Sequence, residues 1–342
     1  MSKRYVLVDW LKAACVVFVI ITHSDFLNDA MLDKNGLFYL LCVNKAVPVF
    51  MFLSGFVFAL GARNVPLGEN YCLSRIVPKL LRLTVPTVIY YIIFVAVMAF
   101  TEDKMSLYEI VKRFIAGDFG RGSYYYAVMV QFTLIAPLMY YLIKKYALWG
   151  VCATGAVNLL YEVIWTIGDF GDGIYRICAL RYLLVIAFGM YLAIREGNRI
   201  KGVYITAMAA VGLTYILLPY FTGYEYKIFT VEPWNRSGMM SAFYVASVMY
   251  MLFYFFGKVG GEGIISRAVC KVGQASYHIM YTQMFYFVVR PAFDKLIFDM
   301  TLLPLWSQYV MDIVVCIVPG LVFCIVDGKI LGKLYQTKRK MC

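Results

Sequence analysis

The sequence contains few charged residues and no long polar segment. Only 15% of its 342 residues are Asp, Glu, Lys or Arg, whereas 62% are hydrophobic. A soluble domain of this size cannot bury so many apolar side chains, because much of its surface faces water. The sequence therefore predicts an integral membrane protein that forms one transmembrane domain over residues 1–342 and has the lipid bilayer as a partner.

Two kinds of site are excluded by the scarcity of their ligands. The nine cysteines include no CxxC pair, and most lie in apolar segments. This pattern indicates buried free thiols rather than a disulfide framework. His23 and His278 are the only histidines, so a metal site with several histidine ligands is not expected. We expect no metal and no permanently bound cofactor.

The net charge of +12 does not indicate a nucleic-acid partner. The basic residues lie in short segments between apolar stretches, where retention of Lys and Arg on the cytoplasmic side explains them. With the N-terminus inside, the cytoplasmic segments hold roughly 19 Lys and Arg residues and the outer segments about 10. We therefore expect both termini, including a tail at about 327–342, to be cytoplasmic.

The apolar segments predict an all-α fold, a polytopic membrane bundle of about ten transmembrane helices. The expected spans are approximately 5–27, 36–62, 78–100, 123–143, 147–167, 180–194, 202–222, 238–257, 271–290 and 308–326. The sixth is short, and Arg181 at its edge is expected to extend to the membrane interface. A short surface helix is also expected within the longest outer loop, 101–122, because its apolar residues recur at helical spacing.

The first span carries three titratable residues on one face. At 100° per residue, Asp9, Lys12 and His23 fall within about 60° of one another. Lys12 and His23 are 11 residues apart, or roughly 16 Å along a helix axis. Asp9 can pair with Lys12 at i, i+3. This face indicates either a functional site or a boundary ion pair with an interfacial histidine. Taken alone, it fits the proton relay of a transporter as well as it fits a catalytic site.

The next two spans add polar and basic candidates. Asn44 is expected near the outer end, at the level of His23, and the Ser54–Gly55 pair permits close approach of a neighbouring backbone. Arg75, Lys79 and Arg82 follow at helical spacing at the inner interface. They form either a cytoplasmic anchor or a site for the phosphates of a nucleotide-bearing donor.

Later spans contain further polar side chains. For each, a helix-packing hydrogen bond is the alternative to a functional role. They are Tyr124, Tyr125, Gln131, Glu162, His278 and Gln283. Glu162 stands out, because an unpaired carboxylate inside a membrane would be costly or protonated.

The order of these motifs resembles the membrane-bound acyltransferase type 3 family. That family carries a basic residue, ten intervening residues and His in its first helix, as from Lys12 to His23 here, with Lys in place of the commoner Arg. The other segments that resemble the family are "VFMFLSGF" at 49–56, "PKLLRLTVP" at 78–86, "YYYAVMVQFTLIAP" at 124–137 and "GQASYHIMYTQMF" at 273–285. The sequence departs from the family at Gln283, where many relatives have His.

The resemblance implies an O-acyltransferase of the bacterial plasma membrane. Its donor would be cytosolic acyl-CoA, most often acetyl-CoA, and its acceptor a hydroxyl of an extracytoplasmic glycan or related surface molecule. His23 would be the general base, which suits a side chain that titrates near neutrality. Lys12, restrained by Asp9, would orient the donor or balance its charge.

The resemblance also implies roles for the remaining candidates. The basic residues of 75–82 would hold the CoA phosphates, and Asn44, Ser54 or a tyrosine of 124–126 would donate a hydrogen bond to the oxyanion. A covalent acyl-histidine is a further option.

Two other functions fit parts of the pattern. A secondary transporter or flippase would use Asp9, Lys12, His23 and Glu162 as a path for protons or substrate. The sequence contains no inverted repeat of the kind such transporters often have. A sensor or assembly scaffold would retain its function in a His23→Ala variant.

Overall fold

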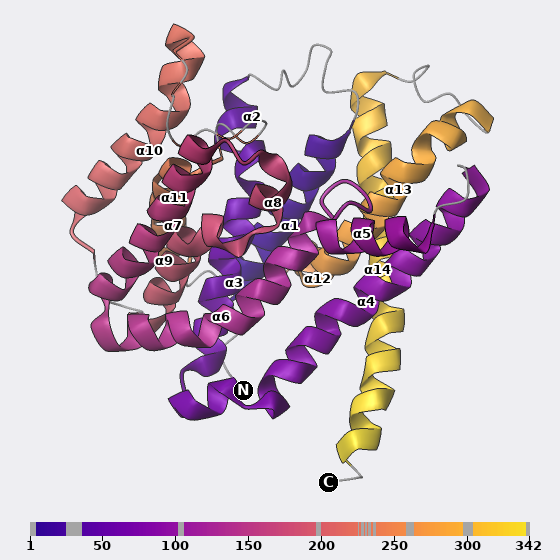
Figure 1. The fold of residues 1–342 in the computed structure, drawn as a ribbon, viewed down its shortest axis with the longest axis horizontal. Helices are drawn as coiled ribbons and strands as arrows, with labels where there is room; N and C mark the ends of the chain where they lie inside the picture. Colours follow the sequence, from indigo (N-terminus) through magenta and orange to yellow (C-terminus); the bar gives the residue numbers. More distant parts are fainter. Residues whose placement is uncertain are drawn as a thin grey trace.

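The computed structural model is an all-α bundle (Figure 1). It describes residues 5–24, 36–101, 106–195, 200–224, 226, 229, 231, 234, 237–257, 263–296 and 304–339. The α-helices are α1 (Val6–His23), α2 (Leu37–Leu41), α3 (Ala46–Ala62), α4 (Leu73–Thr101), α5 (Leu107–Ala116), α6 (Tyr124–Tyr146), α7 (Leu148–Gly168), α8 (Asp172–Ile177), α9 (Leu183–Ile194), α10 (Gly202–Thr222), α11 (Met239–Phe256), α12 (Ile264–Gln274), α13 (Ser276–Leu296) and α14 (Leu305–Arg339). The 3₁₀ turns are η2 (Val43–Lys45), η3 (Leu67–Tyr71) and η4 (Ala179–Tyr182).

The described helices confirm an all-α membrane architecture. Within these ranges, 8 helical segments are long and apolar enough to cross a bilayer. The predicted sixth span corresponds to a shorter apolar helix, Ala179–Ile194. The predicted ninth span falls on α12 and α13, whose polar Tyr, His and Gln residues lower their hydropathy. Ten spans, and the orientation of the termini, therefore stay predictions.

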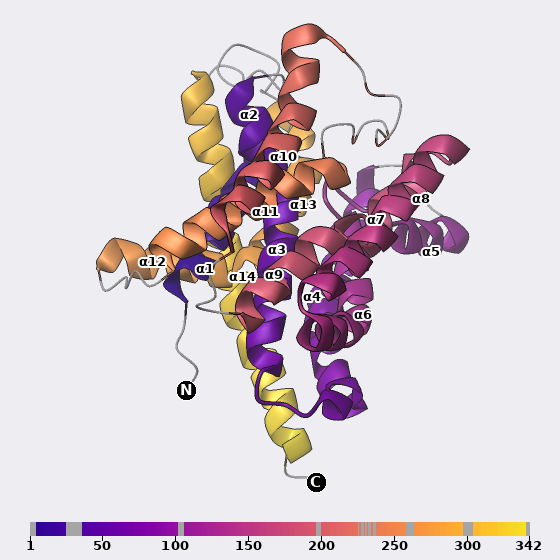
Figure 2. The ribbon, with the colours of Figure 1, turned by 90° about the vertical axis from the view of Figure 1, so that its left-hand side faces the viewer.

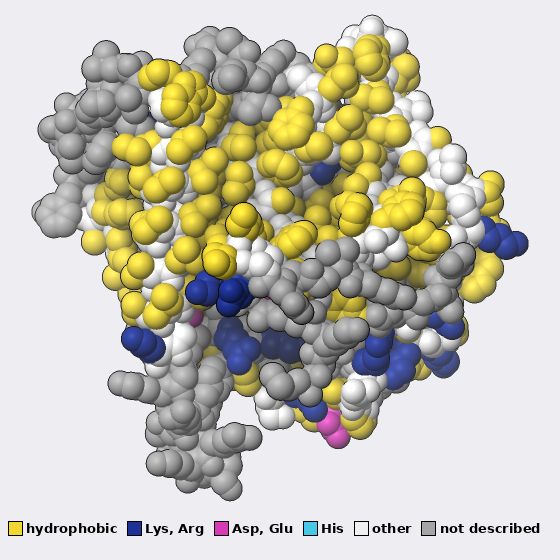
Figure 3. Space-filling model, turned by 180° about the vertical axis from the view of Figure 1, so that it is seen from behind, with side chains coloured by type: hydrophobic (Ala, Val, Ile, Leu, Met, Phe, Trp, Pro, Cys, Tyr) yellow, Lys and Arg dark blue, Asp and Glu magenta, His cyan; other side chains and the backbone are white. Residues whose placement is uncertain are grey.

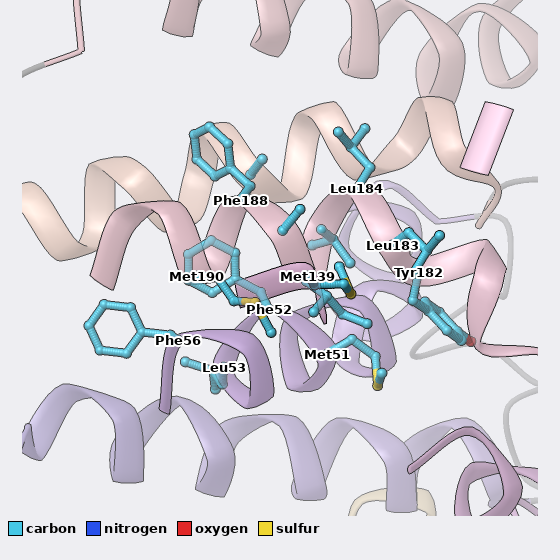
Figure 4. Packing of buried hydrophobic residues seen from close by; sticks show 14 of the residues in the cluster. Met51, Phe52, Leu53, Phe56, Met139, Tyr182, Leu183, Leu184, Phe188 and Met190 are labelled. Carbon is cyan, nitrogen blue, oxygen red and sulfur yellow. The ribbon is translucent and has the colours of Figure 1, made fainter. Parts of the chain in front are cut away.

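Helices α3 and α9 form the centre of the larger half of the bundle. A Cβ at Gly55 would lie 2.3 Å from the Ile186 carbonyl oxygen, and one at Gly189 would lie 2.2 Å from that of Phe52. The two backbones are therefore in direct contact, as expected for small residues between membrane helices. Figure 4 shows the surrounding side chains of this core, in which the ring centres of Phe52 and Phe188 lie 6.4 Å apart. This contact fixes α3, which carries Ser54.

The other half of the bundle is built from α1, α12, α13 and α14. A Cβ at Gly273 of α12 would lie 2.0 Å from the backbone oxygen of Asp9, so α12 and α1 touch through their backbones. At this end of α1, Gln274 Nε2 donates to Asp9 Oδ2 at 3.4 Å. At the other end, the His23 and Phe287 rings lie 6.4 Å apart. Helix α13 therefore runs parallel to α1.

A short amphipathic helix, α5, precedes the loop that reaches the site. Its N-terminus has a capping box, in which Ser106 and Glu109 satisfy each other's backbone N–H groups. It ends at Gly117, which has a positive φ of 59°. The short helix expected within 101–122 is thus confirmed, and its Gly-rich end continues through Gly122 into α6.

The exposed surface of the molecule has a broad hydrophobic face with Lys and Arg side chains at one edge. Figure 3 shows this face, with Lys and Arg side chains gathered below it. Exposed apolar residues include Ile92 of α4 and Val322 of α14, which are 63% and 57% exposed. Helix α14 extends beyond the rest of the molecule on the side where the cations gather (Figures 1 and 2). Such a face, bordered by basic residues, is typical of a protein embedded in a bilayer.

Candidate active site

A cavity of about 550 Å³ lies between α1, α3, α4, α6, α13 and α14. It brings together residues that are distant in the sequence. Those predicted as site residues and found in its lining are Lys12, His23, Ser54, Arg82, Tyr124, Tyr125 and His278. Apolar side chains such as Val16, Val19 and Phe50 line it between its two ends. The cavity therefore follows the predicted face of α1 from Lys12 to His23.

At one end of the cavity, His23 faces the loop before α6. A Cβ at Gly122 would lie 3.6 Å from His23 Nε2, so bare backbone borders this nitrogen. Gly122 has a φ of 95°, which other residues rarely adopt. Arg121 donates a hydrogen bond to the His23 carbonyl oxygen, and its guanidinium lies 5.7 Å from the Phe287 ring centre. A glycine here leaves room for a substrate beside the imidazole.

The end of α1 that carries His23 is held by a buried carboxylate. Ser24 Oγ donates to Asp312 Oδ2 at 2.7 Å, and Tyr286 donates to Asp312 Oδ1 at 2.6 Å. Arg290 Nη1 lies 3.1 Å from Asp312 Oδ2. Asp312 is fully buried, so this network joins α1, α13 and α14 in a low-dielectric interior. This network was not predicted from the sequence, although an Asp inside the last apolar span was a signal.

The opposite end of the cavity is polar and carries two cations. Lys12 and Arg82 line it together with His278 of α13 and Asp327 of α14. His278 Nε2 lies 2.9 Å from Asp327 Oδ2. Asp327 was not predicted as a site residue either, since it lies where the cytoplasmic tail was expected to begin. In the structure α14 continues to Arg339, and Asp327 is 4% exposed.

A family model described as an acyltransferase domain matches residues 5–326. The chain belongs to the acyltransferase 3 family. Among curated proteins and solved structures, no match to the chain is found. The match covers nearly the whole chain, including every residue of the cavity apart from Asp327 and Gly328. The protein is therefore a membrane acyltransferase, an enzyme that transfers an acyl group to a hydroxyl.

The structure separates the three basic residues expected to act together in this acyltransferase. Only Arg82 lines the cavity. Arg75 is exposed and pairs with Glu69 at 3.3 Å. The Lys79 ammonium lies 4.4 Å from the Phe58 ring centre. Arg75 and Lys79 thus lie on α4 outside the cavity.

Asp9 lies next to the cavity but not in its lining. Its side chain is 8% exposed and accepts the hydrogen bond from Gln274. Its predicted pairing with Lys12 stays a prediction. Because Gly273 touches its backbone, Asp9 lies at the contact between α1 and α12.

Three of the four named candidates for donating a hydrogen bond to the oxyanion line the cavity. Tyr124 and Tyr125 line it, as does Ser54, whose Oγ donates to the Phe50 carbonyl oxygen at 2.8 Å. Asn44 lies in η2, outside the lining. Ser54, Tyr124 and Tyr125 therefore stay candidate donors, and Asn44 is separated from them.

Both predicted glutamines lie outside the lining of the cavity. Gln131 Nε2 donates to the Ile177 oxygen at 2.7 Å, and its Oε1 accepts from the Ala179 amide at 3.0 Å. Gln131 therefore ties α6 to the segment before α9, which is a helix-packing role. Gln283 is fully buried in α13, and its amide has no hydrogen-bond partner in the part of the chain that the structure describes.

Glu162 belongs to a separate buried cluster. It accepts hydrogen bonds from the Tyr175 hydroxyl at 2.9 Å and from the Met239 amide at 3.2 Å. Nearby, the Arg181 guanidinium lies 4.3 Å from the Tyr175 ring centre and 4.5 Å from that of Trp234. The expectation that Arg181 extends to the membrane interface was wrong. It is 3% exposed, because this aromatic cage holds the cation by cation–π contacts.

Proposed function

We propose that this acyltransferase moves an acyl group, with acetyl as the first candidate, from cytosolic acyl-CoA to a hydroxyl of an extracytoplasmic glycan or related surface molecule. The observation that carries the proposal is the cavity, which has His23 at one end and Lys12 and Arg82 at the other. A thioester donor with anionic phosphates at its far end matches this distribution of charge.

The length of the donor supports the same assignment. Lys12 and His23 are separated by a rise of about 16 Å along α1. The phosphopantetheine arm of CoA has about 13 bonds between the thioester sulfur and the first phosphorus, and an extended chain advances about 1.2 Å per bond. The arm therefore reaches about 16 Å. With its phosphates at Lys12 and Arg82, the thioester lies at His23.

The reaction then needs one base and one oxyanion site. His23 takes the proton from the acceptor hydroxyl as the hydroxyl oxygen attacks the thioester carbonyl carbon. Ser54, Tyr124 or Tyr125 donates a hydrogen bond to the oxyanion of the tetrahedral intermediate. When the intermediate collapses, the carbon–sulfur bond breaks and the thiolate takes the proton from the imidazolium. The products are the O-acyl ester and free CoA, and no net proton is released.

Positively charged residues bind the rest of the donor. Lys12 and Arg82 bind the phosphates next to the pantetheine arm, and Lys79 and Arg75 contact the nucleotide outside the cavity. Asp9 restrains Lys12 from one helical turn away. The protein holds no permanent cofactor in this scheme, because acyl-CoA is a substrate.

The proposed topology allows the reaction to cross the bilayer. The enzyme lies in the bacterial plasma membrane with both termini cytoplasmic. Its ten spans include the Ala179–Ile194 segment and α13. The Lys12 end of the cavity then opens towards the cytosolic donor, and the His23 end opens towards the acceptor outside.

The experiment that tests this function is a label-transfer assay. Purified protein in lipid nanodiscs is incubated with acetyl-labelled acetyl-CoA and a panel of surface glycans. We expect label on the glycan with wild-type protein and loss of transfer by at least about 100-fold in a Lys12→Ala, Arg82→Ala double variant. A Lys145→Ala variant is the control, because Lys145 is an exposed residue outside the cavity. Absence of transfer from any thioester to any hydroxyl would contradict the proposal.

A further inference from the structure

The His278–Asp327 pair lies at the cation end of the cavity and has no part in the chemistry described above. The two side chains are 14% and 6% exposed, and the 2.9 Å contact joins His278 Nε2 to Asp327 Oδ2. Both line the same cavity as Lys12 and Arg82. A carboxylate beside a phosphate-binding end opposes the binding of anions. Phosphate binding therefore does not explain why Asp327 lies at this end of the cavity.

One buried atom of each side chain lacks a partner. His278 Nδ1 and Asp327 Oδ1 have no hydrogen-bond partner among the described residues. Buried polar atoms are nearly always satisfied, by protein, water or ligand. In the tautomer that carries the ring proton of His278 on Nε2, this proton bonds to Asp327 Oδ2, and Nδ1 keeps a lone pair. Both unsatisfied atoms are then acceptors, so the matching ligand brings hydrogen-bond donors.

The level of the pair along the cavity indicates which part of the donor it meets. Phe287 marks the level of His23, because their rings are 6.4 Å apart. His278 precedes Phe287 by nine residues on α13, a rise of about 13 Å. The pantoate unit of CoA lies about 10 to 13 Å from the thioester sulfur in an extended arm. It carries a secondary hydroxyl beside an amide N–H, and both groups donate hydrogen bonds.

We infer that His278 and Asp327 form a binding subsite for the pantoate part of the acyl-CoA arm. The inference rests on the proposed function, since it requires a CoA thioester in this cavity. The pair lies too far from His23 to touch the reacting atoms, so its role is recognition. It selects a donor that carries the pantoate hydroxyl and amide, whereas Lys12 and Arg82 select the phosphates.

A series of shortened donors tests the subsite. Acetyl-CoA carries phosphates and pantoate, acetyl-pantetheine carries pantoate alone, and acetyl-N-acetylcysteamine carries neither. The measurement is kcat/KM for each donor with one acceptor, for wild type, Asp327→Asn and His278→Gln. We expect both variants to lose about 10-fold with acetyl-CoA and with acetyl-pantetheine. We expect no loss with acetyl-N-acetylcysteamine.

Two comparison variants make the pattern specific. Arg82→Ala should lose activity with acetyl-CoA only, because acetyl-pantetheine has no phosphate. Val326→Ala changes the residue next to Asp327, but its side chain is 47% exposed on the outer face of α14. It should match wild type with all three donors. The ratio of kcat/KM between two donors does not depend on the folded fraction, so a partly unfolded variant still gives an answer.

The outcomes separate the inference from the function on which it rests. An equal loss with all three donors in Asp327→Asn and His278→Gln would show that the pair only holds α13 against α14, and would overturn the subsite. Failure of wild type to use any of the three thioesters would instead overturn the proposed function.

Discussion

Ser24 donates a 2.7 Å hydrogen bond to the buried carboxylate of Asp312. The residue directly after His23 is thereby fixed to a helix residue 288 positions later in the chain. Tyr286 and Arg290 complete the network from α13. The imidazole is thus positioned by a carboxylate that does not line the cavity.

Replacing Asp312 should both destabilise the protein and reduce transfer. Asp312→Asn keeps the shape of the side chain but removes the charge that balances Arg290. Loss of one partner of a buried ion pair costs about 3 to 5 kcal/mol. Thermal unfolding in detergent and label transfer at a temperature where the variant is folded measure the two effects. Asp172→Asn, at an exposed carboxylate, is the control, and an unfolding midpoint equal to that of wild type in Asp312→Asn would contradict the network.

Gly122 should be required for activity more than for folding. An alanine methyl at this position would lie 3.6 Å from His23 Nε2, where the acceptor hydroxyl has to approach. Gly223 is a matched control, because it also has a positive φ of 66° but a Cβ there meets nothing within 4 Å. Both Ala variants should lose about 1 kcal/mol of stability from backbone strain.

Only Gly122→Ala should then lose acyl transfer, by at least about 10-fold. Unfolding midpoints and kcat/KM for the acceptor, measured on both variants, give the comparison. Equal activity of Gly122→Ala and Gly223→Ala would show that the space beside Nε2 is not used.

Glu162→Gln should weaken the fold and leave the catalytic rate per folded molecule unchanged. Its carboxylate accepts bonds from Tyr175 and the Met239 amide, away from the cavity. Weakening these buried hydrogen bonds costs about 1 to 3 kcal/mol. Denaturation and label transfer, normalised to folded protein, test this prediction. A loss of transfer with an intact fold would place Glu162 on a substrate or proton path, as the transporter hypothesis requires.

The features that the sequence predicted are those that depend on one helix. The common face of Lys12 and His23 follows from helical periodicity, and both residues line one cavity. The close approach at Gly55 follows from its lack of a side chain, although the partner, Ile186, was not predictable. Asp312 also lies within an apolar segment, but its network with Ser24 and Arg290 was not predicted.

Features that depend on which helices pack together were not predictable. Asp327 and His278 meet only because α14 runs back along α13, and helical periodicity contains no information on that pairing. Arg82 lines the cavity whereas Arg75 does not, because α4 extends beyond the cavity at its start. The aromatic cage of Arg181 likewise combines side chains from α8, η4 and the segment before α11.

Acyl transfer by a His23→Ala variant tests the central claim most directly. The comparison uses wild type and His23→Ala in nanodiscs, with labelled acetyl-CoA, an acceptor that wild type modifies, and circular dichroism to establish equal folding. General base catalysis contributes about 100- to 10,000-fold, so we expect kcat to fall by that factor while the binding of acetyl-CoA is retained. Transfer at the wild-type rate by folded His23→Ala protein would contradict the account.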